Sequence, residues 1–481
     1  MVLQRAKLTL HIIGSFLKYF ALAYIFPLSV AIHYGEPNWH IYLYALLITL
    51  GIGLILEYGF RTADEIGRAN AFIIVAFTWL SIALLSTLPY VFLGFGFLDA
   101  FFEAMSGFTT TGATILNASG TEQFFALPRS ALLWRSLTQW LGGMGVIVLF
   151  IAILPKLGVG GSQLFEREFP GPLPERLRPR FKNTARLLWG IYVGFTAAEI
   201  ALLRLLARLP LFDSICISFS TLSTGGFTPT VASIGAYTNV YPLAQYIIMF
   251  FMFLAGTNFI IHYHVLRRNW KAIKDDEFRL YLIILAVAIF LIILAQHFSS
   301  YGESVFQTVS IMTTTGFVTA DFASWHSSAK MVLLALMFIG ASGGSTGGAI
   351  KVARASTLIK HTRVMMMKAI SPKAVIPVKY NQKPLAEGVI RDIVSFLFLY
   401  VLVALVASMA LCFIGIDLET AISAVAATLG NVGPGLGGVG PTASYAWLPG
   451  SAKFILIMCM WLGRLELFTV LMIFFPRSWR G

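Results

Sequence analysis

The sequence predicts an all-α polytopic membrane protein, in which four similar repeats surround one central axis and two further spans precede them. The first supporting observation is composition. Of the 481 residues 57% are hydrophobic and 12% charged, with a mean hydropathy of +0.79, whereas soluble domains carry roughly 25% charged residues. The second is the recurrence of long apolar runs. The third is a layout shared by four Gly- and Thr-rich connections, which is the mark of an internal repeat.

The apolar runs predict ten membrane spans. Each is roughly 20 residues long, the length that an α-helix needs to cross the hydrocarbon core. One of them, near 329–365, is long and interrupted by glycines. The predicted spans cover 10–33, 40–58, 70–95, 130–154, 187–209, 242–266, 279–297, 329–365, 389–414 and 452–475.

Basic residues alternate between the connections, and this pattern gives the orientation. The connections 34–41, 96–127, 210–240, 298–327 and 415–450 contain no Lys or Arg, whereas the other connections and both ends of the chain are basic. The positive-inside rule therefore places both termini in the cytoplasm. The net charge of +13 accordingly indicates topology and contact with anionic lipid, with docking of a protein as a second reading, and no nucleic-acid binding is expected.

Four of the Lys- and Arg-free connections repeat one pattern. Each has a short apolar run with an acidic residue near its start, a Gly-centred cluster and a polar return to the next span. Asp99, Asp213 and Glu303 each stand thirteen residues before a glycine, and Asp417 stands sixteen before Gly433. We expect the four acids to cap short re-entrant helices. Attraction of cations is the alternative for Asp99 and for Glu103.

Re-entrant segments of this kind suit a cation. Irregular backbone at membrane depth is tolerated where it is buried in protein or lines a water-filled path. Four extended segments around one axis supply peptide oxygens that can replace the hydration shell of an ion, and each glycine allows the positive φ that such a backbone requires. "TTTGAT" from Thr109 and "TTTGFV" from Thr313 are two of these segments.

A second anomaly is "GASGGSTGGAIK", Gly340 to Lys351, inside the interrupted span. Its five glycines cannot continue a stable helix, because each costs about 1 kcal/mol relative to alanine. A phosphate-binding loop is excluded, since the Gly-Lys-Ser/Thr ending is absent. The segment is therefore either a plain hinge or a loop with a function of its own.

With these motifs the chain resembles the TrkH/TrkG branch of the Trk/Ktr/HKT superfamily of potassium transporters. The resemblance extends over essentially the whole chain and includes "RSLTQWLGGMGVIVL" (135–149), "AGTNFIIHY" (255–263) and "WLGRLELF" (461–468). It implies potassium uptake across the bacterial inner membrane through a channel-like filter. It also implies no enzymatic activity, no cofactor and no transition metal bound by this chain, with K⁺ as the transported ion; conduction and symport both fit.

The resemblance assigns residues by position. The filter oxygens would come from Thr110, Thr111, Gly112, Thr224, Gly225, Gly226, Thr314, Thr315, Gly316, Asn431, Val432 and Gly433. The gate would consist of an intramembrane loop below the filter and an arginine in the last span, namely Gly340, Gly343, Gly344, Ser345, Thr346, Gly347, Gly348, Lys351 and Arg464.

Two arginines inside predicted spans need partners or water, since a charged side chain at the centre of the bilayer costs roughly 2.5–3.5 kcal/mol. For Arg464 an ion pair with Glu466 is the alternative to a position facing the pore, although residues two apart on a helix point to different faces. Arg135 is a weaker gate candidate, because it could reach the outer boundary.

The resemblance also implies partners. It implies a homodimer and a cytoplasmic TrkA-like ring that binds NAD or ATP and docks on basic loops around 156–186, 267–278 and 351–385. An intramembrane enzyme would need a catalytic constellation, and no such pattern stands out. A secondary transporter would be expected to carry inverted repeats, whereas the four repeats predicted here all enter from the outer side.

The spans and motifs also predict how the chain is divided. The predicted units are two N-terminal helices (1–68), repeat 1 (69–156), a cytoplasmic linker (157–182), repeat 2 (183–268), repeat 3 (269–365) with the gating loop 340–350, a second linker (366–385) and repeat 4 (386–481).

Overall fold

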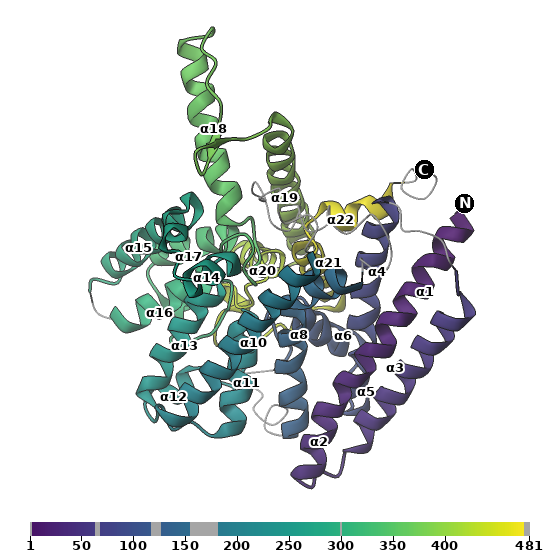
Figure 1. Ribbon diagram of the computed structural model, residues 1–481. Helices are drawn as coiled ribbons and strands as arrows, with labels where there is room; N and C mark the ends of the chain where they lie inside the picture. Colours follow the sequence, from purple (N-terminus) through teal and green to yellow (C-terminus); the bar gives the residue numbers. More distant parts are fainter. Residues whose placement is uncertain (1, 63–67, 117–126, 154–180, 299–300, 476–481) are drawn as a thin grey trace.

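The structure is a computed structural model that describes residues 2–62, 68–116, 127–153, 181–298 and 301–475. Figure 1 shows helices throughout this part of the chain, with α18 extending out of the body at the same end as the start of α1. By length and composition, six of the described helices can cross a membrane, and two bent helix pairs raise this to eight. The predicted class, an all-α polytopic membrane protein, is confirmed.

The described helices come in the following order along the chain. Those with α-helical geometry are α1 (Val2–Phe20), α2 (Ile25–His33), α3 (His40–Gly59), α4 (Arg68–Leu85), α5 (Leu88–Phe92), α6 (Phe97–Phe108), α8 (Arg129–Ile153), α10 (Phe181–Leu205), α11 (Leu211–Leu222), α12 (Gly235–Thr238), α13 (Pro242–Ala255), α14 (Phe259–Leu266), α15 (Asp276–Ala295), α16 (Tyr301–Met312), α17 (Ser327–Ile339), α18 (Val352–Ile370), α19 (Glu387–Phe413), α20 (Leu418–Leu429), α21 (Gly450–Arg464) and α22 (Phe468–Leu471). The strands of the described residues, β1 (Lys379–Tyr380) and β2 (Lys383–Pro384), pair antiparallel.

The two N-terminal spans pack closely against each other, and α1 also packs against α4. A Cβ atom on Gly14 of α1 or on Gly53 of α3 would meet the backbone of the other helix. Small residues at a crossing let two membrane helices approach in this way. The Nζ atom of Lys18 also lies 2.6 Å from a carboxylate oxygen of Glu57 and ties the pair together at one end.

Two predicted spans are not single helices. The span 242–266 consists of α13 and α14, which meet at 101°, and the span 452–475 consists of α21 and Phe468–Phe474, which meet at 110°. Asn258 caps α14 by accepting a hydrogen bond from the backbone N–H of Ile260. Glu466 takes a positive φ of 54° at the second bend. Hydropathy counts apolar residues and carries no information on direction, so it could not indicate these bends.

Four short helices, α6, α11, α16 and α20, form the inner part of the molecule. Each has 12 residues and ends four residues before a glycine, Gly112, Gly226, Gly316 or Gly433. Repeat 4 therefore keeps the same register as the others. Thr420 takes the place of the acidic residue, since it also stands thirteen residues before its glycine. The sixteen-residue spacing that uses Asp417 is thus not the structural equivalence.

The repeats surround the centre in a closed cycle. Each short helix packs between the two longer helices of its own repeat, and it also contacts the helix that follows the Gly-centred segment of the preceding repeat. These second contacts join α8 to α11, α13 to α16, α17 to α20 and α21 to α6. Because the last pair joins repeat 4 to repeat 1, the fourfold arrangement is complete.

Candidate functional site

The four glycine-centred segments lie at the inner ends of the short helices. Segment 1 is Thr109–Gly112, segment 2 is Ser223–Gly226, segment 3 is Thr313–Gly316 and segment 4 is Gly430–Gly433. All their threonines, the serine, Asn431 and Val432 are at most 1% exposed. Each segment begins at the carboxyl end of a helix, where the dipole is partially negative.

The backbone of all four segments is the same. The residue two positions before each glycine has a positive φ of 52–58° (Thr110, Thr224, Thr314 and Asn431), and the glycines have φ values of 75–103°. In each case the N–H of the residue just before the glycine donates to a carbonyl five residues earlier, at 2.7–2.9 Å. This is the hydrogen bond of a Schellman ending. Three β-branched threonines hold a conformation that is costly for them, which surrounding structure must impose.

The segments close into a ring at their glycines. A Cβ atom on Gly112 would meet the carbonyl oxygen of Gly225, and one on Gly226 would meet that of Thr315. The same relation joins Gly316 to Val432 and, across the cycle, Gly433 to Thr111. Each glycine thus touches the next segment at the peptide just before that segment's own glycine. A side chain at any of the four positions would push two repeats apart.

Side-chain hydrogen bonds hold the four segments in place. One of the side chains, Tyr445, was not expected from the sequence. The hydroxyls of Thr109 and Thr111 lie 2.7 Å apart, and those of Thr313 and Thr315 lie 2.8 Å apart. Asn431 donates to the hydroxyl of Thr111 at 2.9 Å, which links segments 4 and 1. Tyr445 donates to the carbonyl of Gly433 at 2.8 Å.

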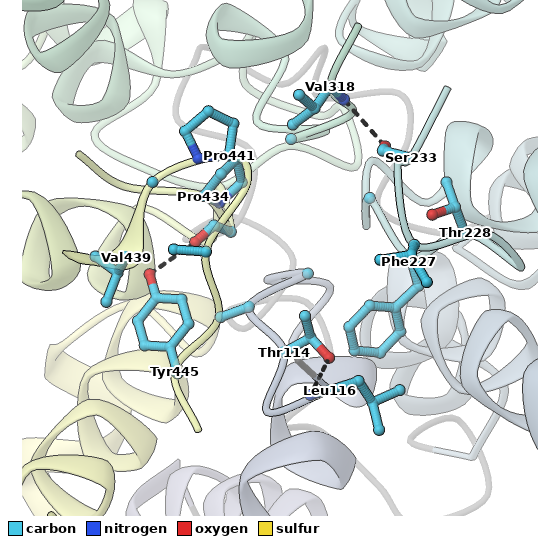
Figure 2. A pocket seen from close by; sticks show the side chains of 18 of the residues that line it. Thr114, Leu116, Phe227, Thr228, Ser233, Val318, Pro434, Val439, Pro441 and Tyr445 are labelled. Carbon is cyan, nitrogen blue, oxygen red and sulfur yellow. Dashed lines mark hydrogen bonds between the residues drawn. The ribbon is translucent and has the colours of Figure 1, made fainter. Parts of the chain in front are cut away.

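A cavity of about 80 Å³ opens beyond the glycines. Its lining includes Gly112, Gly226, Gly316 and Gly433 together with the chain that follows each of them. Figure 2 shows Thr114 and Leu116, Phe227 and Thr228, Val318, and Pro434 and Tyr445 facing it from different sides. The ring therefore has a polar recess on the side of the Lys- and Arg-free connections.

Arg135 lines this recess. It is 2% exposed, and its Nε atom lies 2.8 Å from a carboxylate oxygen of Glu103, which is 1% exposed. The guanidinium also donates to the carbonyl of Thr228 at 3.1 Å and to the hydroxyl of Thr114 at 3.2 Å. The guanidinium of Arg135 is thus held inside the protein by these three partners. Glu103 balances a buried positive charge, which leaves little of its own charge to attract a free cation.

The acidic residues at the starts of the short helices do not share a capping role. Asp417 alone among the four expected caps accepts such a bond, from the N–H of Thr420 at 3.0 Å, and this hydrogen bond lowers its pKa. Asp99, Asp213 and Glu303 lie inside the first turn of their helices. Asp99 instead pairs with Lys453 at 2.6 Å.

The glycine-rich loop lies on the other side of the ring from the recess. α17 ends at Ile339 and α18 begins at Val352, so the chain leaves helical geometry over Gly340–Lys351. The N–H of Gly348 donates to the hydroxyl of Thr314 at 2.9 Å, and the hydroxyl of Thr346 donates to the carbonyl of Leu222 at 3.0 Å. A Cβ atom on Gly348 would meet Asn431. The loop therefore contacts segments 3 and 4 at the residues that precede their glycines.

Arg464 joins this loop to the first inner helix. Its guanidinium donates to the carbonyl of Thr346 and to the carbonyls of Gly142 and Gly143 in α8, each at 2.8 Å. Arg464 ends α21 at the 110° bend, rather than lying midway along a straight span. Glu466 pairs with Lys351 at 3.3 Å and with Arg354 at 2.5 Å. Both pairs connect the bend to the end of the loop.

Glu277 was not singled out from the sequence, yet it also holds the loop. One carboxylate oxygen accepts hydrogen bonds from the N–H of Gly343 at 2.5 Å and from the N–H of Ala353 at 3.0 Å. The other oxygen accepts from the hydroxyl of Tyr380 in β1 at 3.4 Å. Glu277 is 2% exposed. The hairpin β1–β2 and the loop therefore share one buried carboxylate.

Residues 154–180 lie outside the described residues, so the docking role expected of 156–186 has no structural description over most of its length. Within the described residues there is no group of three or more His, Cys, Asp or Glu side chains that could hold a metal ion.

Comparisons with known proteins agree with this architecture. A family model described as "TrkH: Cation transport protein" matches residues 43–480. The chain is 37% identical to the Trk system potassium uptake protein TrkH of Halomonas elongata, covering 98% of this chain and 99% of that protein. It is 34% identical to the Trk system potassium uptake protein TrkG of Escherichia coli, covering 99% of each.

A solved structure matches as well. The crystal structure of the potassium transporter TrkH from Vibrio parahaemolyticus superposes with a TM-score of 0.87 over 100% of both chains, at 33% identity. The relatives are named as transporters and uptake proteins, which confirms the expectation that this chain is not an enzyme. The resemblance inferred from the sequence motifs is likewise confirmed. The chain belongs to the TrkH family of cation transport proteins.

Proposed function

We propose that this protein takes up potassium across the bacterial inner membrane through the ring of four segments, which acts as its selectivity filter. One observation carries the proposal: four segments with the same backbone and the same glycine contacts close into a single ring. Curated relatives named as potassium uptake proteins, which match nearly the whole chain, support the choice of ion. The oxygens come from the twelve residues of segments 1–4 that the resemblance assigns.

The chemistry follows from peptide oxygens and charge. A potassium ion that enters from the outer recess exchanges water for carbonyl oxygens of the ring. The carboxyl ends of α6, α11, α16 and α20 meet at the segments, and their partial negative charges favour a cation. The membrane potential draws the ion inward with about 2.3 kcal/mol per charge per 100 mV. K⁺ is thus the substrate.

The glycine-rich loop and Arg464 form the gate in this proposal. The loop bonds to Thr314 and lies beside Asn431, so an ion that has passed the glycines meets it next. Arg464 bonds to the loop at Thr346 and brings a positive charge that repels cations. Five glycines give the loop several backbone conformations of similar energy, which a gate requires.

The remaining features of the proposal concern placement and partners. Both termini lie in the cytoplasm, where α18 and the hairpin β1–β2 lie too. The protein works as a homodimer with a cytoplasmic TrkA-like ring that binds NAD or ATP. Basic residues of the described docking segments, such as Lys271, Lys274 and Lys360, support this placement because cytoplasmic connections are rich in Lys and Arg.

Expression in a bacterium that lacks its own potassium uptake systems tests the function. Wild-type protein is expected to restore growth at low external potassium. External potassium should also inhibit the uptake of rubidium into those cells. An empty vector and a variant truncated before Gly433 are the controls. Growth that depends on external sodium rather than potassium would contradict the proposal.

Glu277→Ala tests the gate, because Glu277 holds the glycine-rich loop in place by hydrogen bonds. This change removes one hydrogen bond to the loop backbone at Gly343 and one to the first turn of α18 at Ala353, and each buried bond is worth roughly 1 kcal/mol or more. We expect basal rubidium flux into liposomes that contain the purified protein, without any cytoplasmic partner, to rise by about fivefold to tenfold. Glu277→Gln keeps an acceptor oxygen at the same place and is the matched control, with flux near wild type. Equal flux in all three proteins would remove Glu277 from the gate.

A further inference from the structure

Segment 2 lacks a side chain that the other three segments have. The residue just before the ring glycine is Thr111 in segment 1, Thr315 in segment 3 and Val432 in segment 4, but it is Gly225 in segment 2. The φ of Gly225 is not positive, so the backbone conformation does not require glycine here. Another reason must exclude a side chain.

Gln139 of α8 supplies that reason. A Cβ atom on Gly225 would run into the Cβ, Cδ and Oε1 atoms of Gln139. The glutamine side chain therefore fills the space in which a residue such as threonine would begin. Gln139 is fully buried, and it reaches segment 2 from the inner helix of repeat 1.

The amide of Gln139 also makes two hydrogen bonds to the backbone of segment 2 and its continuation. Its Nε2 atom donates to the carbonyl of Gly225 at 2.5 Å, and its Oε1 atom accepts from the N–H of Phe227 at 3.0 Å. These bonds lie on either side of Gly226, the ring glycine. A side chain that bonds on both sides of one residue fixes the position of that residue.

The other segments are fixed by means that segment 2 cannot use. Segments 1 and 3 have hydroxyl pairs, Thr109 with Thr111 and Thr313 with Thr315. In segment 4, Tyr445 donates to the carbonyl of Gly433. Because Gly225 has no hydroxyl, segment 2 cannot form the threonine pair, and Gln139 stands in its place.

We propose that Gln139 is a positioning residue that determines ion specificity, because it replaces the missing side chain at Gly225 and sets the position of the segment 2 backbone in the ring. The proposal rests on the filter function given above. It also assigns segment 2 a weaker part in binding the ion, since the Gly225 oxygen already accepts a hydrogen bond. The filter is therefore asymmetric in its chemistry although its backbone is fourfold.

Substitutions at Gln139 and Gly225, made singly and together, test the proposal. Gln139→Leu keeps the volume and removes both hydrogen bonds, whereas Gly225→Thr places a side chain where Gln139 lies. The double variant Gln139→Ala with Gly225→Thr frees the space and restores the threonine found in segments 1 and 3. Gln245→Leu, at a half-buried position of α13, is the matched control. Each full-length protein is purified, checked for a single peak in size-exclusion chromatography and reconstituted into liposomes.

The readout is rubidium uptake in competition with potassium and with sodium. We expect Gln139→Leu to lower the preference for potassium over sodium by about tenfold, as the loss of two buried hydrogen bonds implies. Gly225→Thr alone should be inactive or poorly folded. The double variant should return to within about threefold of wild type, a rescue that a purely structural role of Gln139 does not predict.

Other outcomes separate this proposal from the filter itself. A well-folded Gln139→Leu protein with wild-type ion preference would overturn the role of Gln139. If that variant does not fold, the double variant decides, and failure of the rescue overturns the role equally. Gly316→Ser in segment 3 serves as the reference. If it changes ion preference while the Gln139 variants do not, the filter stands and only the present proposal fails, whereas an unchanged preference in Gly316→Ser removes the filter assignment.

Discussion

Replacement of Gly316 by serine is expected to abolish most of the preference for potassium over sodium. Gly316 has a φ of 75°, and a Cβ atom would meet the carbonyl oxygen of Val432 and the ring of Pro434. The serine therefore combines a strained backbone with displacement of segment 4. Strain of this kind costs about 1–3 kcal/mol, and a difference of that size between the two ions corresponds to a change of about 5-fold to 150-fold in ion preference. Competition of sodium with rubidium uptake in liposomes measures it.

Gly302→Ser provides the matched control for this prediction. Gly302 lies near the start of α16 in the same repeat, and a Cβ atom there would meet nothing within 4 Å. We expect this variant to keep the wild-type preference. Two variants with the same preference would show that segment 3 does not contact the conducted ion.

Arg464→Ala is expected to raise basal flux at least tenfold. The substitution removes a positive charge and three hydrogen bonds, one to the loop at Thr346 and two to α8. Hydrogen bonds to charged groups contribute about 1.5–3 kcal/mol each, so loss of even one is enough for a tenfold change. Rubidium flux into liposomes that contain the purified protein, without a cytoplasmic partner, is the measurement.

Two further substitutions separate charge from anchoring at Arg464. Lys keeps the charge but cannot bond to carbonyls of the loop and of α8 in the same geometry, whereas Gln keeps hydrogen-bond donors without the charge. High flux in Arg464→Gln with low flux in Arg464→Lys would identify electrostatic repulsion as the main barrier. If Arg464→Ala conducts no faster than wild type, Arg464 has no part in the gate.

The sequence was sufficient for the membrane class, for the family and for the four short helices. Each of these depends on information that is local in the chain, namely the length of an apolar run and the glycine that follows it. The bends were missed because they depend on distant contacts. Gly256, at the first bend, accepts a hydrogen bond from the N–H of Ser342, and Glu466, at the second, pairs with Lys351 and Arg354.

In the candidate site, too, the features set by local sequence could be predicted, and those set by distant contacts could not. Positive φ at Gly112, Gly226, Gly316 and Gly433 could be expected from the residue type, whereas positive φ at three threonines could not. In repeat 4 the alignment on Gly433 agrees with the helix boundaries, which place Thr420 where the other repeats have Asp or Glu. A charge in an apolar span needs a counter-charge, so Glu103 of the same repeat could have been paired with Arg135. Gln139 left a weaker signal, a second glycine in segment 2.

The ring is closed by residues from opposite ends of the chain. Gly433 meets the carbonyl of Thr111, and Asn431 donates to the hydroxyl of the same threonine. During synthesis, the ribosome delivers three quarters of the ring long before the residues that complete it. A nascent chain that lacks repeat 4 therefore has an open ring, which closes only when Gly433 and Asn431 reach Thr111.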